Sequence, residues 1–469
     1  SEMCIRDSYY IVQMFSKEIY TARRKKLAET IPSGLILLPG NEESPMNYAD
    51  NPYHFRQDST FLYYFGINQA SLAGIIDADS GEAMLFGDDY SVEMIVWTGV
   101  VPGIASLGEK IGVRKVQAFN ELQTVISEAI AAKRPVHFLN PYRADILIRL
   151  SELLQCHYQA IPGMASLELV KAVIAQREVK SSEEIAEIDK AVNITVEMHL
   201  AGMRHARPGM RESEVAAKVA EPALAANGHP SFPIIATING QTLHNHYHGN
   251  IMKSGDLFLL DAGAETESGY GGDLSSTFPV DPSFTPIQKE IYQLSLDAHM
   301  SAVAMLRPGT AFKEVHLSAC RTIFEGLKAF GLTRGDTHEA VDAGAHALFF
   351  PCGTGHMMGL DIHDMENLGE QWVGYDGVPK STQFGLKSLR LAKELRPGYV
   401  LTIEPGIYFI PELMDQWRSE RHLEQFLNYT EIEKFKNFGG LRNEEDFLIT
   451  KEGSRRLGNA LPLTIEGVE

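Results

Sequence analysis

Residues 257–277 read LFLLDAGAETESGYGGDLSST. The apolar run at the start ends in Asp261, and a second carboxylate, Asp273, follows twelve residues later. An ionised carboxylate beside a buried strand has to be neutralised, because an unpaired charge there is costly. The glycines between the two aspartates favour a hairpin, which would bring both onto neighbouring strands. This stretch therefore predicts an antiparallel strand pair that carries two acidic groups.

Three segments further along the chain each place one possible metal ligand, a histidine or a glutamate, beside a strand or a glycine turn. His356 follows the sequence PCGTG, whose glycines allow the backbone to approach closely. The sequence VLTIEPG alternates at a period of two, which puts Glu404 on the same face as Thr402. The sequence RNEED precedes an apolar run and adds Glu444, with Glu445 as the adjacent alternative.

Together these segments supply four carboxylates and one imidazole, a charge of about −4 that two divalent cations would neutralise. An oxygen-rich set with one histidine favours Mn²⁺, Co²⁺ or Zn²⁺ over a structural cysteine site. Taken one at a time, an acid at a strand end can equally be a cap or a surface charge. A histidine in a glycine loop can equally be a hydrogen-bonded structural residue. Only the joint order and spacing of the five favour a metal centre.

On either side of these segments the chain divides into two regions. Residues 20–176 alternate short apolar strands with helical stretches, which is typical of an α/β layer domain. A polar stretch follows, in which Ser181 and Glu184 have the spacing of a helix capping box. We expect an α/β domain over residues 14–176 and an α+β domain over residues 182–469.

The composition limits the class of protein. The 469 residues are 44% hydrophobic and 22% charged, a balance typical of globular proteins. A formal net charge of −19 argues against a nucleic-acid partner, because phosphate binding needs a basic surface. The four cysteines show no CxxC spacing, so we expect no disulfide framework and a cytoplasmic location. No apolar run is long enough for a membrane span, and we expect no secretion signal and no membrane partner.

Five stretches of the second region, DAGAE, GGDLSSTFP, GTGHMMGLDIHD, LTIEPGIYF and RNEEDFLIT, resemble the pita-bread metallopeptidases of the prolidase and aminopeptidase P family. Residues 55–66 look like the N-terminal creatinase-type domain of the same enzymes. The resemblance implies an α+β pita-bread fold behind an α/β creatinase-type domain. It also implies an exopeptidase that hydrolyses the bond between an N-terminal residue and proline.

The resemblance assigns metal ligands residue by residue. Asp261 matches a bidentate ligand of one metal, and Asp273 matches a ligand that bridges both metals. His356 and Glu404 match the ligands of the other metal, and Glu444 matches the second bridging carboxylate. The family chemistry implies two divalent ions, Mn²⁺ foremost with Co²⁺ or Zn²⁺ as alternatives, and a metal-bridging hydroxide that attacks the carbonyl before proline. Glu404 would pass a proton to the departing proline nitrogen.

The resemblance also implies two histidines at the substrate. His244 matches a substrate-contacting histidine, with His246 and His248 as alternatives on the same face of an expected strand. His363 matches a second histidine beside the scissile bond. We expect His363 and Tyr408 to form walls of a proline pocket.

Three further residues complete the expected substrate site. Arg390 resembles the arginine with which prolidases hold the substrate's C-terminal carboxylate, a group that a guanidinium fork fits well. That role would favour dipeptides. Arg442, two residues before the bridging glutamate, is a further expected substrate-site residue. Cys352 stands where the family often has a histidine, and is expected either to shape the peptide site or to serve as a small apolar wall.

The implied partners are short peptides with proline at position two, and the implied assembly is a homodimer or tetramer. Substrate length, dipeptide or longer peptide, is left open by the sequence. Two alternatives remain: a non-catalytic pita-bread binding protein, and an aminopeptidase of the same fold without proline specificity. The presence of all five ligands argues against the first, and the N-terminal domain argues against a methionine aminopeptidase.

Overall fold

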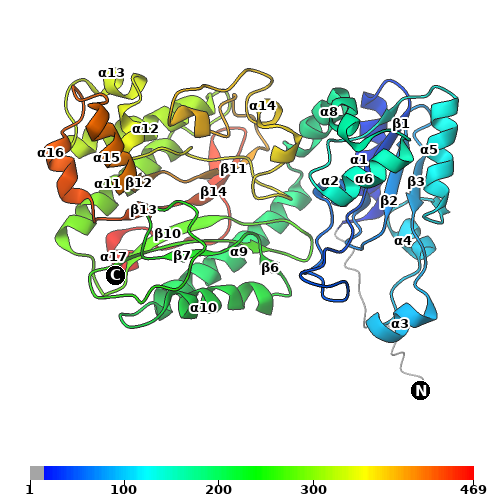
Figure 1. Ribbon diagram of the computed structural model, residues 1–469, viewed down its shortest axis with the longest axis horizontal. Helices are drawn as coiled ribbons and strands as arrows, with labels where there is room; N and C mark the ends of the chain where they lie inside the picture. The colour runs from blue at the N-terminus through cyan, green and yellow to red at the C-terminus, as the bar shows by residue number, and fades with distance from the viewer. Residues whose placement is uncertain (1–14) are drawn as a thin grey trace. The chain divides into compact units, whose positions relative to one another are not determined.

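The structure is a computed structural model that describes residues 15–469 (Figure 1). The domain start expected at Met14 lies outside the described residues. The chain forms two compact units, which meet in the sequence between Arg177 and Glu178. None of the helices described for residues 15–469 is long and apolar enough to cross a membrane.

The N-terminal unit is built on a mixed five-stranded sheet with the strand order β4-β3-β2-β1-β5. Its strands are β1 (Leu35–Pro39), β2 (Ala73–Asp77), β3 (Ala83–Phe86), β4 (Lys115–Gln117) and β5 (Val136–His137). Its helices are α1 (Lys17–Thr30), α2 (Ser59–Phe65), α3 (Val92–Thr98), α4 (Ile104–Lys110), α5 (Glu121–Ala131), α6 (Ala144–Leu153), α7 (Ile161–Met164) and α8 (Leu167–Arg177).

Strand alternation sends side chains to helices on both faces of this sheet. Ile75 packs with Ile126 of α5 and Leu150 of α6 in one buried cluster. The adjacent Gly74 points the other way, where a Cβ atom would lie 2.2 Å from the ring of Phe65 in α2. A glycine is therefore required at this position for α2 to pack against the sheet.

The C-terminal unit packs paired helices against several small sheets. Its helices are α9 (Ser182–His205), α10 (Glu212–Ala225), α11 (Pro286–Val303), α12 (Phe312–Leu327), α13 (Thr337–Asp342), α14 (Glu370–Val373), α15 (Pro411–Glu420), α16 (Tyr429–Ile432) and α17 (Ile465–Val468). Helices α9 and α10 form one pair, and α11 and α12 form another. The predicted capping box of α9 is confirmed, since Ser181 Oγ accepts from the Glu184 N–H and Glu184 Oε2 accepts from the Ser181 N–H.

The strands of this unit bring distant segments together. They are β6 (His229–Pro230), β7 (Ile235–Thr237), β8 (Leu257–Ala262), β9 (Ala264–Glu265), β10 (Leu274–Pro279), β11 (Val400–Ile403), β12 (Gly406–Tyr408), β13 (Gly440–Arg442), β14 (Glu445–Ile449) and β15 (Ser454–Arg456). The sheets have the orders β10-β8-β7, β11-β14-β15, β12-β13 and β6-β9. Helices α9 and α10 contact the first of these sheets, and α11 contacts β11, β12 and β13.

The antiparallel pair predicted around the two aspartates is confirmed. Strand β8 pairs with β10 in a register that sets Ser275 opposite Asp261. A bridge from Ser275 to Glu444 connects this hairpin to the start of β14, and a bridge from Met357 to Leu401 connects the His356 loop to β11. Four segments that are far apart in the sequence therefore meet in the middle of the unit.

Candidate metal centre

Asp273, His356 and Glu444 converge where these four segments meet. One ligand atom from each lies within 4.8 Å of the others, and all three side chains are buried. The Nε2 atom of His356 lies 3.5 Å from Asp273 Oδ2 and 3.6 Å from Glu404 Oε1. The structure thus brings Glu404 to the same place. Oxygen and nitrogen atoms at these separations can share a divalent cation.

The strand β11 and its neighbours fix the His356 ring. The His356 N–H donates to Thr402 Oγ1 at 3.2 Å, and its carbonyl accepts from the Thr402 N–H at 3.0 Å. Nδ1 lies 3.0 Å from the Met357 carbonyl, which can only accept, so this nitrogen carries a proton. Nε2 is then directed at the carboxylates, the arrangement usual for a metal-binding histidine. Thr402 Oγ1 also lies 3.4 Å from Glu404 Oε1, as expected from their shared strand face.

The charges at this centre are unbalanced in the absence of a cation. Burial raises the pKa of Asp261 to about 7, although the nearby Arg442 opposes that rise. Burial and the charge of Asp273 hold the pKa of Glu444 well above its usual range. Burial lowers the pKa of His356, but the hydrogen bond to Asp273 and the charge of Glu404 outweigh it and raise the value to about 9. Each shift is one that a bound divalent cation would relieve.

Two buried carboxylate oxygens at this centre lack hydrogen-bond partners within the described part of the chain, which is what ligand atoms of a metal site would show. Asp261 Oδ1 and Asp273 Oδ1 have no hydrogen-bond partner among residues 15–469. Buried acceptors of this kind are rare unless an ion or a water completes them. With Nε2 of His356 and the carboxylates of Glu404 and Glu444, they form an oxygen-rich donor set that suits divalent cations.

Arg442 donates hydrogen bonds from all three guanidinium nitrogens to residues around the metal ligands. Nη2 donates to Asp261 Oδ2, Nε donates to Ser275 Oγ at 2.9 Å, and Nη1 donates to the Tyr408 hydroxyl at 2.9 Å. Ser275 Oγ in turn donates to Glu444 Oε2 at 2.7 Å. Arg442 and Tyr408 are both buried, so their expected contact with substrate stays a prediction, whereas their contact with the ligand network is observed.

His363 and Arg390 lie on one side of the centre and share an acidic partner. The His363 and His356 rings have centroids 4.3 Å apart. His363 Nδ1 lies 3.3 Å from Glu366 Oε2, and Arg390 Nη1 lies 2.6 Å from the same oxygen. Sequence reasoning missed Glu366, which positions both residues.

His244 belongs to the same group by its electrostatics. Partial desolvation of its ring lowers its pKa, and the charges of Arg442, Arg390 and His363 lower it further. The strand expected around His244 is wrong, because residues 245–250 form an irregular segment. Asn245 is the reason: its side chain accepts from the Tyr247 N–H and donates to Thr237 Oγ1, a local turn that competes with strand pairing. The alternative His248 is bound to the Ile234 carbonyl. His244 and His246 are both exposed, so exposure does not distinguish between them.

Comparison with known proteins identifies the family of this arrangement. Residues 186–451 match the pattern described as Metallopeptidase family M24, and residues 20–137 match Aminopeptidase P, N-terminal domain. The chain belongs to metallopeptidase family M24. The pita-bread fold and the creatinase-type N-terminal domain expected from the sequence are thereby confirmed, as is the expectation of a metallopeptidase.

Relatives of this M24 chain extend over nearly its whole length. It is 28% identical to the Xaa-Pro dipeptidase of Homo sapiens, covering 96% of this chain and 92% of the relative. It is 30% identical to the Xaa-Pro aminopeptidase of Escherichia coli (strain K12), covering 97% of both. Among solved structures, Zn-substituted E. coli aminopeptidase P in complex with product is 28% identical, covers 97% of both chains and has a TM-score of 0.79.

Cys352 lies near enough to Glu404 for the charge of that carboxylate to act on its thiol. Burial and the charge of Glu404 raise the pKa of its thiol to about 12, so the group is uncharged at neutral pH. An uncharged thiol is a weak ligand and a weak nucleophile. Both expected roles of Cys352, in the peptide site or as a small apolar wall, are compatible with this state.

Asp446 is a buried acid that the sequence reasoning missed. Its Oδ2 accepts from the Asp273 N–H at 3.0 Å, while Oδ1 has no partner among the described residues. Burial and the charge of Asp273 hold its pKa well above the usual range. The signal was present, because Asp446 follows Glu444 at the period of a strand. Glu445 points elsewhere and pairs with Arg456 at 3.2 Å, so the structure places Glu444 at the centre.

Proposed function

We propose that this M24 chain is an Xaa-Pro exopeptidase, which hydrolyses the peptide bond between an N-terminal residue and proline. The observation that carries the proposal is the convergence of Asp273, His356 and Glu444 around buried carboxylate oxygens without partners. The substrate class is supported by full-length relatives named Xaa-Pro dipeptidase and Xaa-Pro aminopeptidase.

The five residues predicted as ligands would hold two divalent ions. Asp261 would bind one ion, His356 and Glu404 the other, and Asp273 and Glu444 both. When bound, the ions would supply an activated water at neutral pH and stabilise negative charge at the scissile carbonyl. The native metal in this proposal is Mn²⁺, in line with the oxygen-rich donor set, and Co²⁺ or Zn²⁺ would substitute.

Residues around the ligands would complete the reaction. His244 has a lowered pKa and would stay neutral at pH 7, where its N–H could donate to the carbonyl oxygen as negative charge develops. His363 lies next to His356 and could donate in the same way. Glu404 would carry the proton from the water to the proline nitrogen, the usual task of a positioned carboxylate.

Arg390 would select short substrates. Its contacts with Glu366 and Glu370 both use Nη1, at 2.6 and 3.4 Å, so the rest of the guanidinium fork can face a substrate carboxylate. In an Xaa-Pro dipeptide the proline itself carries the free C-terminal carboxylate, whereas in a longer peptide that carboxyl group is part of the next peptide bond. We therefore propose a preference for dipeptides.

We further propose two functional domains, residues 14–176 and 182–469, in a cytoplasmic homodimer or tetramer. The described cysteines Cys156, Cys320 and Cys352 are all free, which agrees with a reducing compartment. Size-exclusion chromatography with light scattering would measure the assembly, and a monomer would contradict it.

The activity is tested with metal-stripped protein to which Mn²⁺, Co²⁺ or Zn²⁺ is returned. We expect cleavage of a Gly-Pro dipeptide, loss of cleavage in Asp273→Ala, and weaker dipeptide binding in Arg390→Ala. Preferred cleavage of an Arg-Pro-Pro tripeptide would contradict the role of Arg390 and indicate an aminopeptidase. Absence of cleavage of either peptide with every metal would overturn the proposed function and favour a binding protein.

A further inference from the structure

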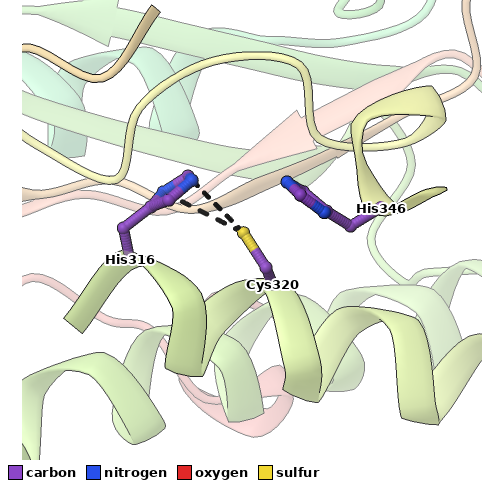
Figure 2. Close-up of side chains that lie close together, drawn as sticks. All are labelled: His316, Cys320 and His346. Atoms are coloured by element: carbon purple, nitrogen blue, oxygen red, sulfur yellow. Dashed lines mark hydrogen bonds between the residues drawn. The ribbon is translucent and has the colours of Figure 1, made fainter. Parts of the chain in front are cut away.

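A second group of metal-ligand side chains lies outside the carboxylate centre. It consists of His316, Cys320 and His346, all fully buried (Figure 2). His316 and Cys320 are one turn apart on α12 and face the same side, and His346 comes from the 3₁₀ turn Ala345–Leu348. The ligand atoms of all three lie within 4.8 Å of one another.

The His316 ring is already oriented as a ligand would be. Its Nδ1 lies 2.8 Å from Thr354 Oγ1, and its Nε2 lies 3.4 Å from Cys320 Sγ. A hydroxyl that accepts from Nδ1–H leaves the Nε2 lone pair directed at the sulfur, and such an outer partner is usual for a metal-binding histidine. Ligands of a tetrahedral zinc ion, one nitrogen and one sulfur, are separated by roughly 3.5 Å, given the usual Zn–N and Zn–S distances.

His346 provides an independent observation. Neither ring nitrogen has a hydrogen-bond partner of normal geometry among the described residues, although the side chain is wholly buried. Figure 2 shows the ring directed toward Cys320. The backbone of Val341 interacts with the ring but makes no hydrogen bond of normal distance and angle. A buried imidazole without a well-formed hydrogen bond is costly, so a further ligand would stabilise it.

We propose that His316, Cys320 and His346 bind a third metal ion, of the zinc type, separately from the carboxylate centre. One thiolate and two imidazoles form a borderline-soft set, which selects Zn²⁺ over the Mn²⁺ that suits carboxylates. Burial lowers the pKa of His316 to about 3 and that of His346 to about 4, so both rings are neutral and able to ligate. Burial raises the pKa of Cys320, so formation of the sulfur–metal bond releases one proton from Sγ to solvent.

The third site would brace the loop that carries His356. Thr354 connects the two centres, because its hydroxyl contacts His316 and its carbonyl accepts from the Glu404 N–H at 2.8 Å. The excess negative charge of the carboxylate centre also favours a cation nearby. This third site shares no ligand with the carboxylate centre. Its metal binding can therefore be tested independently of the proposed peptidase activity.

Co²⁺ is the probe that tests this site, because a cobalt–thiolate bond gives a charge-transfer absorption that oxygen and nitrogen ligands alone do not. Metal-stripped full-length protein in the Asp273→Ala background would be titrated with Co²⁺, and bound metal would be counted. We expect one bound equivalent with the thiolate absorption. Both should be kept in the matched control Cys352→Ser and lost in Cys320→Ser.

A second variant guards against a folding defect. His346→Gln keeps the thiol and should weaken Co²⁺ binding by about tenfold or more, with circular dichroism to check the fold. Absorption that persists in Cys320→Ser but disappears in Cys352→Ser would overturn the assignment. So would absence of the absorption in the parent protein, or unchanged affinity in folded His346→Gln.

Discussion

Cys352 shows how burial controls the chemistry of a single side chain. Its thiol has a pKa of about 12, whereas alkylation requires the thiolate. Cys156 and Cys352 are both intermediate in exposure, so access alone does not separate them. Because the pKa of Cys352 is raised, we expect iodoacetamide to modify Cys156 well before Cys352 in metal-free protein at pH 8. Peptide mass spectrometry over a time course measures both rates. Equal rates at the two cysteines would contradict the effect of burial and of Glu404.

The planar guanidinium group of Arg442 positions several residues around the metal centre. Its three nitrogens hold Asp261, Ser275 and Tyr408, and the point charge of a lysine cannot replace this geometry. Arg442→Lys should therefore weaken Mn²⁺ binding by about tenfold to a hundredfold, the usual cost of losing an outer-shell partner.

Calorimetric titration measures that affinity, and Arg455→Lys is the matched control. Arg455 pairs with Asp189 at the surface, with a side chain that is 45% exposed. An exposed ion pair contributes little, so the control should bind Mn²⁺ as the parent does. Equal affinity in both variants would show that Arg442 does not position the ligands.

The loop that carries His356 can pack against β11 only because residue 355 is a glycine. A Cβ atom on Gly355 would lie 2.0 Å from the Thr402 carbonyl oxygen and 3.0 Å from the ring of Phe312. Gly355→Ala must therefore displace the loop, and with it His356. We expect a loss of about 1–3 kcal/mol in the free energy of unfolding, as for an overpacked core, together with weaker Mn²⁺ binding.

Urea unfolding and metal titration measure these two effects. Gly163→Ala is the control, because nothing lies within 4 Å of a Cβ atom there. The control should unfold at the parent's urea concentration or higher, since alanine stabilises helices relative to glycine. A Gly355→Ala protein as stable as the control would show that the loop can adapt.

The sequence predicted local patterns better than long-range contacts. The β8–β10 hairpin followed from an apolar run and glycines, and the α9 cap from two residues three apart. The pairing of Arg442 with Asp261 joins residues 181 apart, and it depends on how separate sheets meet. The cluster around His346 likewise depends on a turn that meets α12 only after folding. Local periodicity contains no information about such contacts.

At the scale of the whole molecule, folding gathers more acid than base at one buried point. Asp261, Asp273, Glu444 and Asp446 are buried together with Arg442 as the fixed cation. Burying these like charges together raises the free energy of the folded chain. Strand pairing and helix packing do not offset this electrostatic cost, because they place no additional positive charge beside the carboxylates. Cations and protons are the two species that can relieve it, so they must compete for the folded chain.

This competition predicts how stability depends on pH. The folded metal-free chain holds Asp261 at a pKa of about 7, Glu444 and Asp446 well above their usual ranges, and His356 at about 9. Groups whose pKa is raised by folding stabilise the fold while protonated, and that contribution is lost as pH rises through the folded pKa. Buried histidines with lowered pKa, such as His199 at about 4, act oppositely only below about pH 6.5.

Between pH 6.5 and 8, therefore, the melting temperature of metal-free protein should fall, and Mn²⁺ should raise it more at pH 8 than at pH 6.5. At one fixed Mn²⁺ concentration, set to 100 times the Kd at pH 8, the ion would add about 2.7 kcal/mol to the free energy of unfolding at pH 8 and less at pH 6.5, where protons compete for the carboxylates. Scanning calorimetry at both pH values measures the difference, and Asp273→Ala, which lacks a shared ligand, should show a much smaller rise. A rise with Mn²⁺ that is equal at both pH values, or larger at pH 6.5, would mean that these carboxylates do not exchange protons for metal.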